Sequence, residues 1–211
     1  MTNHVPVTPT GEYADIEVSD QHVALAALAD PRARGEAVAR VLAAPEEHSP
    51  PVLMAMAAVV FGEGHAAQRS WTIGAGHGET GAFWFYAAQL RARIDANRCT
   101  DPTAAAACGV LTETYGPPIN RWAFHEPGLL PGLIDRVAQW DAATASVYDP
   151  RWIALHGMGA FTGTDGPLTR PAAQWPSIAA LTRREFVEGV HELYDDDGRL
   201  RTELFGRPRD T

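Results

Sequence analysis

The chain has 211 residues, 45% of them hydrophobic, and a formal net charge of −9 at pH 7. This length and apolar content suit one folded domain and exclude a disordered tail. No apolar run reaches the roughly 18 residues of a membrane helix, the start lacks the pattern of a secretory signal, and the acidic charge argues against a nucleic-acid partner. We therefore expect a cytoplasmic protein that binds neither membrane nor nucleic acid.

Residue usage narrows the chemistry further. All 17 basic residues are arginine, so Schiff-base catalysis and a P-loop lysine are excluded. The cysteines, Cys99 and Cys108, are too few for a zinc site or a disulfide framework of their own. We expect two buried thiols rather than a disulfide, and no cofactor.

Helix signals follow one another along the chain. Residues 1–18 hold prolines and a short apolar alternation, which predicts an extended arm lying on the domain. Asp30, Asp101 and Asp149 each precede a proline, the pattern of a helix N-cap followed by proline at the first helical position. The predicted helices span residues 19–29, 31–44, 50–62, 65–73, 79–98, 102–116, 117–126, 127–143, 150–157 and 177–198.

The sequence predicts an all-α fold. Strand signals are almost absent, and residues 158–176, rich in Gly, Thr and Pro, are predicted to form a loop. We expect a helical array or bundle of about eight helices with short connections. It would form a single domain over residues 19–198, followed by an exposed tail over 199–211.

The predicted helix 79–98 carries two stripes at helical spacing. The apolar stripe is Phe83, Ala87, Leu90 and Ile94, and the neighbouring stripe is Trp84, Ala88, Arg91, Asp95 and Arg98. Asp95 is four residues from Arg91 and three from Arg98, so these charges can pair on the helix surface. Either they pair with neighbouring helices, or Trp84 and the charges form a groove floor that recognises an anion or a peptide carboxylate. The binding candidates are Trp84, Arg91, Arg93, Asp95 and Arg98.

Residues 52–96 resemble a known kind of helical repeat. The stretch "AMAAVVFGEG…GHGETGAFWFYAAQLRA" is similar to Sel1-like and tetratricopeptide repeats, in which small residues and a Trp-Tyr pair let two helices pack closely. The matching residues are Ala55, Ala57, Gly76, Ala82, Trp84, Tyr86, Ala87 and Ala88. The stretch also resembles bacterial helical proteins with an FWFYxxQLRAR helix. The resemblance implies a protein-interaction scaffold, although no second copy of the repeat is visible.

A glycine-rich stretch holds residue types that bind metals. Glu63, His65, His77 and Glu79 are suitable zinc ligands, but their spacing matches no motif. Only an irregular loop could bring them together, and the glycines around them allow such a loop. The same glycines also fit an ordinary role, which is to end one helix and to begin the next.

Two histidines near predicted helix ends are candidate general bases. His125 and His156 lie among aromatic residues, with Glu126 or Asp141 as a helper. Alternatively, each histidine only caps the last carbonyls of its helix.

Two classes of function remain. The first is a protein-interaction module, in one version an immunity- or antitoxin-type partner whose negative charge meets a basic protein. The second is a small helical enzyme that acts on an anionic molecule, with a histidine base or a His/Glu metal site and with Arg91 or Arg93 holding the anion. Convergence of the polar residues into a pocket would favour the second class.

Overall fold

The protein is all-α, as predicted. The computed structural model describes residues 10–66, 75–125, 128–163, 166–195 and 197–201, without the side chains of residues 63–66 and 75–77. In this part of the chain there are helices and no strands. The α-helices are α1 (Ser19–Ala29), α2 (Arg34–Ala43), α3 (Pro50–Ala66), α4 (Ala75–Arg98), α5 (Ala106–Tyr115), α6 (Pro117–His125), α7 (Leu129–Ala143), α8 (Gly159–Thr162) and α9 (Trp175–His191). The 3₁₀ helices are η1 (Gly11–Asp15), η2 (Pro45–Glu47), η3 (Pro102–Ala105), η4 (Pro150–His156) and η5 (Ala172–Gln174).

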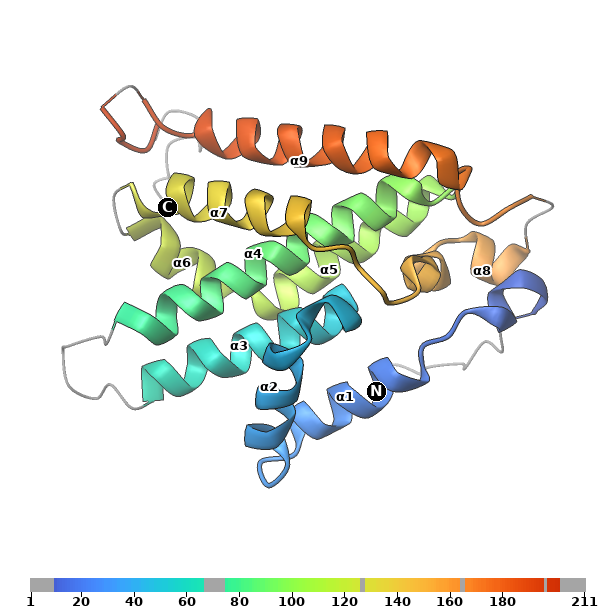
Figure 1. Cartoon of the computed structure of the whole chain (residues 1–211), viewed down its shortest axis with the longest axis horizontal. Coiled ribbons are helices and arrows are strands. Elements are labelled where there is room, and N and C mark those ends of the chain that lie inside the picture. The colour runs from blue at the N-terminus through green and yellow to red at the C-terminus, as the bar shows by residue number, and fades with distance from the viewer. Residues whose placement is uncertain (1–9, 67–74, 126–127, 164–165, 196, 202–211) are drawn as a thin grey trace, which may run out of the picture.

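Helix α4 is the centre of the fold. It packs along α3 on one side and against α7 and α9 on the other, and α5, α6 and η4 also contact it (Figure 1). Residues of α4 that are fully shielded from solvent include Phe85, Ala88 and Leu90. Because α4 touches most other elements, polar residues on its sides become buried between helices rather than exposed.

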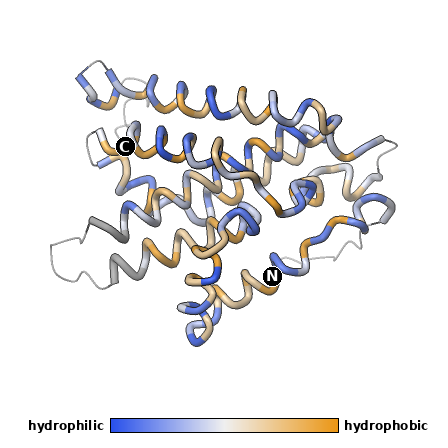
Figure 2. Tube along the Cα trace, in the orientation of Figure 1, coloured by the Kyte–Doolittle hydropathy of each residue, from blue (hydrophilic) through white to orange (hydrophobic). Residues whose placement is uncertain are grey.

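Helices α3 and α4 pack unusually closely. A Cβ at Gly81 of α4 would lie 2.7 Å from Cβ of Phe61 and 3.0 Å from the carbonyl oxygen of Ala57, both in α3. Only glycine fits at this crossing. Much of α3 is hydrophobic (Figure 2), and residues 52–57 of this helix are all buried.

Both helices are longer than the sequence predicts. Helix α3 continues to Ala66 and α4 begins at Ala75, so Gly62, Gly64, Gly76 and Gly78 lie inside helices and not in breaks. The sequence predicts a separate helix over residues 65–73, but residues 65–66 form the end of α3. Residues 67–74 lie outside the described part. Each glycine in a helix costs about 1 kcal/mol relative to alanine, so these helix ends form in spite of the local preference.

Two of the three Asp-Pro signals mark helix starts, with tighter first turns than expected, whereas Asp30-Pro31 opens a turn and α2 begins at Arg34. Asp101 and Asp149 accept hydrogen bonds from the backbone N–H of Thr103 and Arg151, which confirms both caps. Each cap opens a 3₁₀ helix, and η4 is 3₁₀ throughout. The predicted loop 158–176 holds α8 and η5, and the last helix ends at His191, earlier than predicted.

The ends of the described chain pack on the helices. Tyr13 and Ile16 of the N-terminal arm are buried in a small hydrophobic cluster with Trp152 of η4. At the other end, Arg201 donates a hydrogen bond to the carbonyl of Tyr194, so the first residues of the predicted tail fold back. None of the helices in the described ranges is both long and apolar enough to cross a membrane.

Candidate functional site

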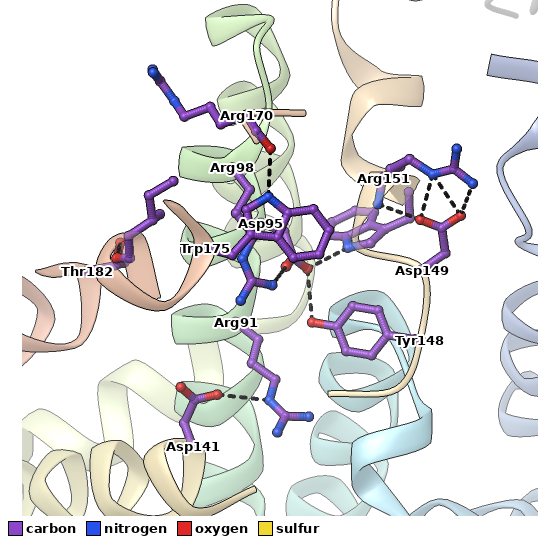
Figure 3. Close-up of polar contacts among 12 residues, drawn as sticks. Arg91, Asp95, Arg98, Asp141, Tyr148, Asp149, Arg151, Arg170, Trp175 and Thr182 are labelled. Atoms are coloured by element: carbon purple, nitrogen blue, oxygen red, sulfur yellow. Dashed lines mark hydrogen bonds and ion pairs between the residues drawn. The ribbon is translucent and has the colours of Figure 1, made fainter. Parts of the chain in front are cut away.

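Asp95, near the C-terminal end of α4, is the centre of a buried polar cluster. It is 1% exposed and accepts three side-chain hydrogen bonds. Arg98 Nη1 lies 3.3 Å from Oδ1, while Tyr148 OH and Trp152 Nε1 each lie 2.9 Å from Oδ2. Tyr148 comes from the connection after α7, and Trp152 from η4. Figure 3 shows the hydroxyl of Tyr148 directed at the carboxylate of Asp95.

Burial makes Asp95 difficult to ionise. Removal from water raises the pKa of this carboxyl to about 7, although the hydrogen bonds from Trp152 and Tyr148 and the charges of Arg98 and Arg91 act in the opposite direction. The same burial, together with the nearby carboxylate, raises the pKa of the Tyr148 hydroxyl. Asp95 can therefore gain or lose a proton near neutral pH, whereas Tyr148 remains a hydrogen-bond donor.

A second carboxylate holds two more arginines beside this cluster. Asp141, near the end of α7, accepts from Arg91 Nε at 3.0 Å and from Arg183 Nε of α9 at 2.8 Å. Arg91 also donates through Nη2 to the carbonyl of Thr144, at 2.9 Å, and so caps the end of α7. Three helices are thus joined through one buried carboxylate.

These groups line one pocket of about 470 Å³. Its charged lining residues are Arg91, Asp95, Arg98, Asp141 and Arg183, so guanidinium groups outnumber carboxylates by one. Nη1 of Arg91 and Nε of Arg98 are buried and have no hydrogen-bond partner among the described residues. A buried guanidinium N–H without an acceptor is costly, and native proteins usually satisfy it with water or a ligand.

Two indole rings hold the arginines in place. The guanidinium carbon of Arg91 lies 4.1 Å from the ring centre of Trp140, and that of Arg98 lies 5.0 Å from the ring centre of Trp175. Such stacking fixes the plane of each guanidinium without using its N–H groups. Of the nitrogens of these two guanidinium groups, Nη1 of Arg91 and Nε of Arg98 are the buried ones that lack an acceptor among the described residues.

The structure separates the predicted binding residues. Arg91, Asp95 and Arg98 meet at the pocket, although Arg91 pairs with Asp141 rather than with Asp95, and the pairs are buried rather than on the helix surface. Trp84 does not line this pocket but packs edge-to-face against Trp140 with ring centres 5.1 Å apart. Arg93 lies over Phe186, 4.9 Å from the ring centre, and lines a different pocket.

The two candidate catalytic histidines lie elsewhere. His125 is exposed at the end of α6, with Nδ1 3.2 Å from the carbonyl oxygen of Arg121, which matches the helix-capping alternative. His156 ends η4, where its ring meets Trp152 edge-on and burial lowers the pKa of the imidazole. Neither lines the pocket around Asp95. Of the predicted helpers, Asp141 is engaged by two arginines, and Glu126 lies outside the described residues.

The predicted metal ligands are only partly described. Glu79 pairs with Arg136 of α7. The side chains of Glu63, His65 and His77 lie outside the described part, while the backbone at all three positions is helical and not an irregular loop. Within the described residues, no group of three or more His, Cys, Asp or Glu side chains is placed to hold a metal ion.

The two cysteines are not bridged. Cys99 is buried and Cys108 is half-buried, and both are free thiols. Burial raises the pKa of each thiol, so neither is an activated nucleophile at neutral pH.

Sequence reasoning does not find several residues of the pocket and of the Asp95 cluster. It does not single out Arg183, Tyr148 or Trp152, and it considers Asp141 only as a helper for a histidine. For Asp141 a signal exists, because it continues the buried stripe of α7 one turn after Val137. A charge at a position where an apolar residue is expected indicates a buried ionic partner.

Comparison with protein-family models, with curated proteins and with solved structures gives no match. The Sel1-like and tetratricopeptide resemblance stays a prediction. The indication of function therefore comes from the geometry and charge of the pocket itself.

Proposed function

We propose that this protein is a binding protein that recognises an anionic group, a carboxylate, in the pocket around Arg91. The observation that carries the proposal is the buried Nη1 of Arg91, which has no acceptor among the described residues although Nε and Nη2 of that guanidinium both donate within the protein. A carboxylate is the natural acceptor for a guanidinium held in a fixed plane.

The other arginines support the same role. Arg183 uses only Nε in its pair with Asp141, and its side chain is 24% exposed, so its outer N–H groups are accessible to a ligand. Nε of Arg98 is a further buried donor without a partner in the described chain. Both side chains line the pocket.

A binding role is also the first class predicted from the sequence. The carboxylate can be carried by a free small molecule or by the C-terminus of a peptide or partner protein, since the recognised group is the same. A basic partner, as expected from the net charge of −9, is a further proposal that needs its own test. An enzyme with a histidine base receives no support from the pocket, because His125 and His156 do not line it.

Isothermal titration of the purified protein with sodium acetate tests the proposal. Loss of one charge-assisted hydrogen bond is worth about 1.5–3 kcal/mol, so Arg91→Lys should weaken acetate binding by about tenfold or more. Arg183→Gln, at a more exposed position, should weaken it while leaving the fold intact. Arg93→Lys, on the same helix but outside the pocket, is the matched control and should bind as the wild type does.

Two further arms separate the sources of the carboxylate. A short alanine peptide with a free C-terminus should bind more tightly than acetate if a chain end is recognised, and its amidated form should not bind. Equal acetate binding by the Arg91→Lys, Arg183→Gln and Arg93→Lys variants, with circular dichroism confirming that all are folded, would refute the site.

A further inference from the structure

We propose that the ligand of this pocket is a monocarboxylic acid with an uncharged, apolar body about the size of one aromatic ring. This rests on the proposed binding of a carboxylate and specifies the class of molecule that carries it. Three features of the pocket lead to it, namely its charge, its hydrogen-bond donors and its apolar wall.

The charge of the pocket suits one negative charge. With both carboxylates ionised, the three guanidinium groups leave an excess of one positive charge. The N-terminus of α9, at Trp175 and Pro176, lines the pocket and adds partial positive charge, but the C-terminus of α7, at Ala142 and Ala143, adds partial negative charge. A second negative charge on the ligand would have no counter-charge in a partly buried site, which is unfavourable.

The donors suit a carboxylate better than a phosphate. The buried unpartnered nitrogens belong to side chains, Nη1 of Arg91 and Nε of Arg98. Helix N-termini that bind phosphate present several successive backbone N–H groups. The first turn of α9 contains Pro176, which has no N–H, so this helix end offers fewer donors to a tetrahedral anion. Two carboxylate oxygens need fewer donors than three phosphate oxygens.

The remaining wall of the pocket combines small apolar residues with the polar side chains of Thr144, Ser146 and Tyr148. Its apolar lining residues are Ile94, Ala142, Ala143, Ala145, Ala172, Trp175, Pro176 and Ala179. Alanine side chains leave room beside the arginines, and Trp175 presents an aromatic surface. Apolar surface of this kind gains free energy by covering an apolar ligand group, and a pocket of about 470 Å³ has room for a small ring compound.

A panel of titrations at about pH 8, where Asp95 with its pKa of about 7 is mostly ionised, tests the inference. The probes are benzoate, acetate, phthalate, inorganic phosphate and benzamide. We expect benzoate to bind about tenfold or more tightly than acetate, because its ring is buried, and more tightly than phthalate, phosphate or benzamide.

A pair of alanine variants locates the apolar body. Ala172→Leu fills the pocket from η5 and should weaken benzoate binding several-fold while leaving acetate unchanged. Ala180→Leu is the matched control, since Ala180 is exposed on α9 and does not line the pocket. If Ala172→Leu has no effect on benzoate, the ring is not held where we place it and the inference fails.

The titrations distinguish failure of the ligand class from failure of the proposed function. Tighter binding of phthalate or phosphate than of benzoate would overturn the monocarboxylate class but would retain an anion site. Equal binding of acetate and benzoate would overturn the apolar body alone, and equal binding of benzamide and benzoate would overturn recognition of the charge. No binding of any anion, to protein shown to be folded, would overturn both proposals.

Discussion

Replacing Asp95 by asparagine should remove a dependence of stability on pH. The pKa of Asp95 is about 7 in the folded protein and its ordinary value is 3.8. Between these values the folded state holds a proton that the unfolded state has released, so the free energy of unfolding falls as pH rises. The contribution is fully present below the ordinary pKa and is lost as pH rises through the folded one.

The magnitude depends on the size of the shift. Each pKa unit is worth about 1.4 kcal/mol, so the two units between about pH 5 and pH 7 correspond to about 3 kcal/mol. The Asp95→Asn variant cannot titrate at this position. Relative to the variant, the wild type should therefore lose about 3 kcal/mol of stability between about pH 5 and pH 8.

Urea unfolding followed by circular dichroism at several pH values measures this difference. Any constant change in stability caused by the asparagine cancels, because only the slope with pH is compared. Parallel curves for the wild type and the variant would show that Asp95 is ionised throughout and would refute the description of this carboxyl as difficult to ionise.

Three further predictions concern packing, hydrogen bonding and ligand binding. Gly81→Ala should destabilise the fold by about 1–3 kcal/mol, because the added Cβ clashes with Phe61. Gly109→Ala should stabilise α5 by about 0.5–1 kcal/mol, because an added Cβ there meets nothing within 4 Å. Thermal unfolding measures both changes. Trp152→Phe removes a hydrogen bond to Asp95 and should cost about 1–3 kcal/mol, with a further rise in the pKa of Asp95 that moves the midpoint of the pH–stability curve upward. Benzoate affinity should fall as pH rises through about 7, because ionisation of Asp95 lowers the excess positive charge of the pocket from two to one. Titrations at several pH values that give one constant affinity would contradict this.

The local signals of the sequence predict that the helices exist, but they do not predict where α3 ends and α4 begins. Helix α1 spans Ser19–Ala29 as expected, and the Asp101 and Asp149 caps form. The glycines near residues 62–78 mislead, because they lie inside α3 and α4 and not in a break between helices. An added Cβ at Gly78 would lie 3.2 Å from the ring of Trp122 in α6, so glycine there allows close packing and not a chain break.

The sequence predicts the candidate site only in part. The spacing of the charges on α4 correctly indicates the pair of Asp95 and Arg98, but the predicted pair of Arg91 with Asp95 is wrong, because Arg91 pairs with Asp141. Their burial depends on Asp141 and Arg183, which are about fifty to ninety positions further along the chain and reach α4 only after α7 and α9 pack against it. Such long-range contacts leave no signal in the pattern of a single helix.

A crystal structure of the protein grown with benzoate tests the central claim most directly. We expect a carboxylate bound among Arg91, Arg98 and Arg183, with the ring against the alanines and Trp175 of the pocket wall. Ordered water alone beside Arg91 at saturating benzoate, or benzoate bound only at another surface, would contradict it.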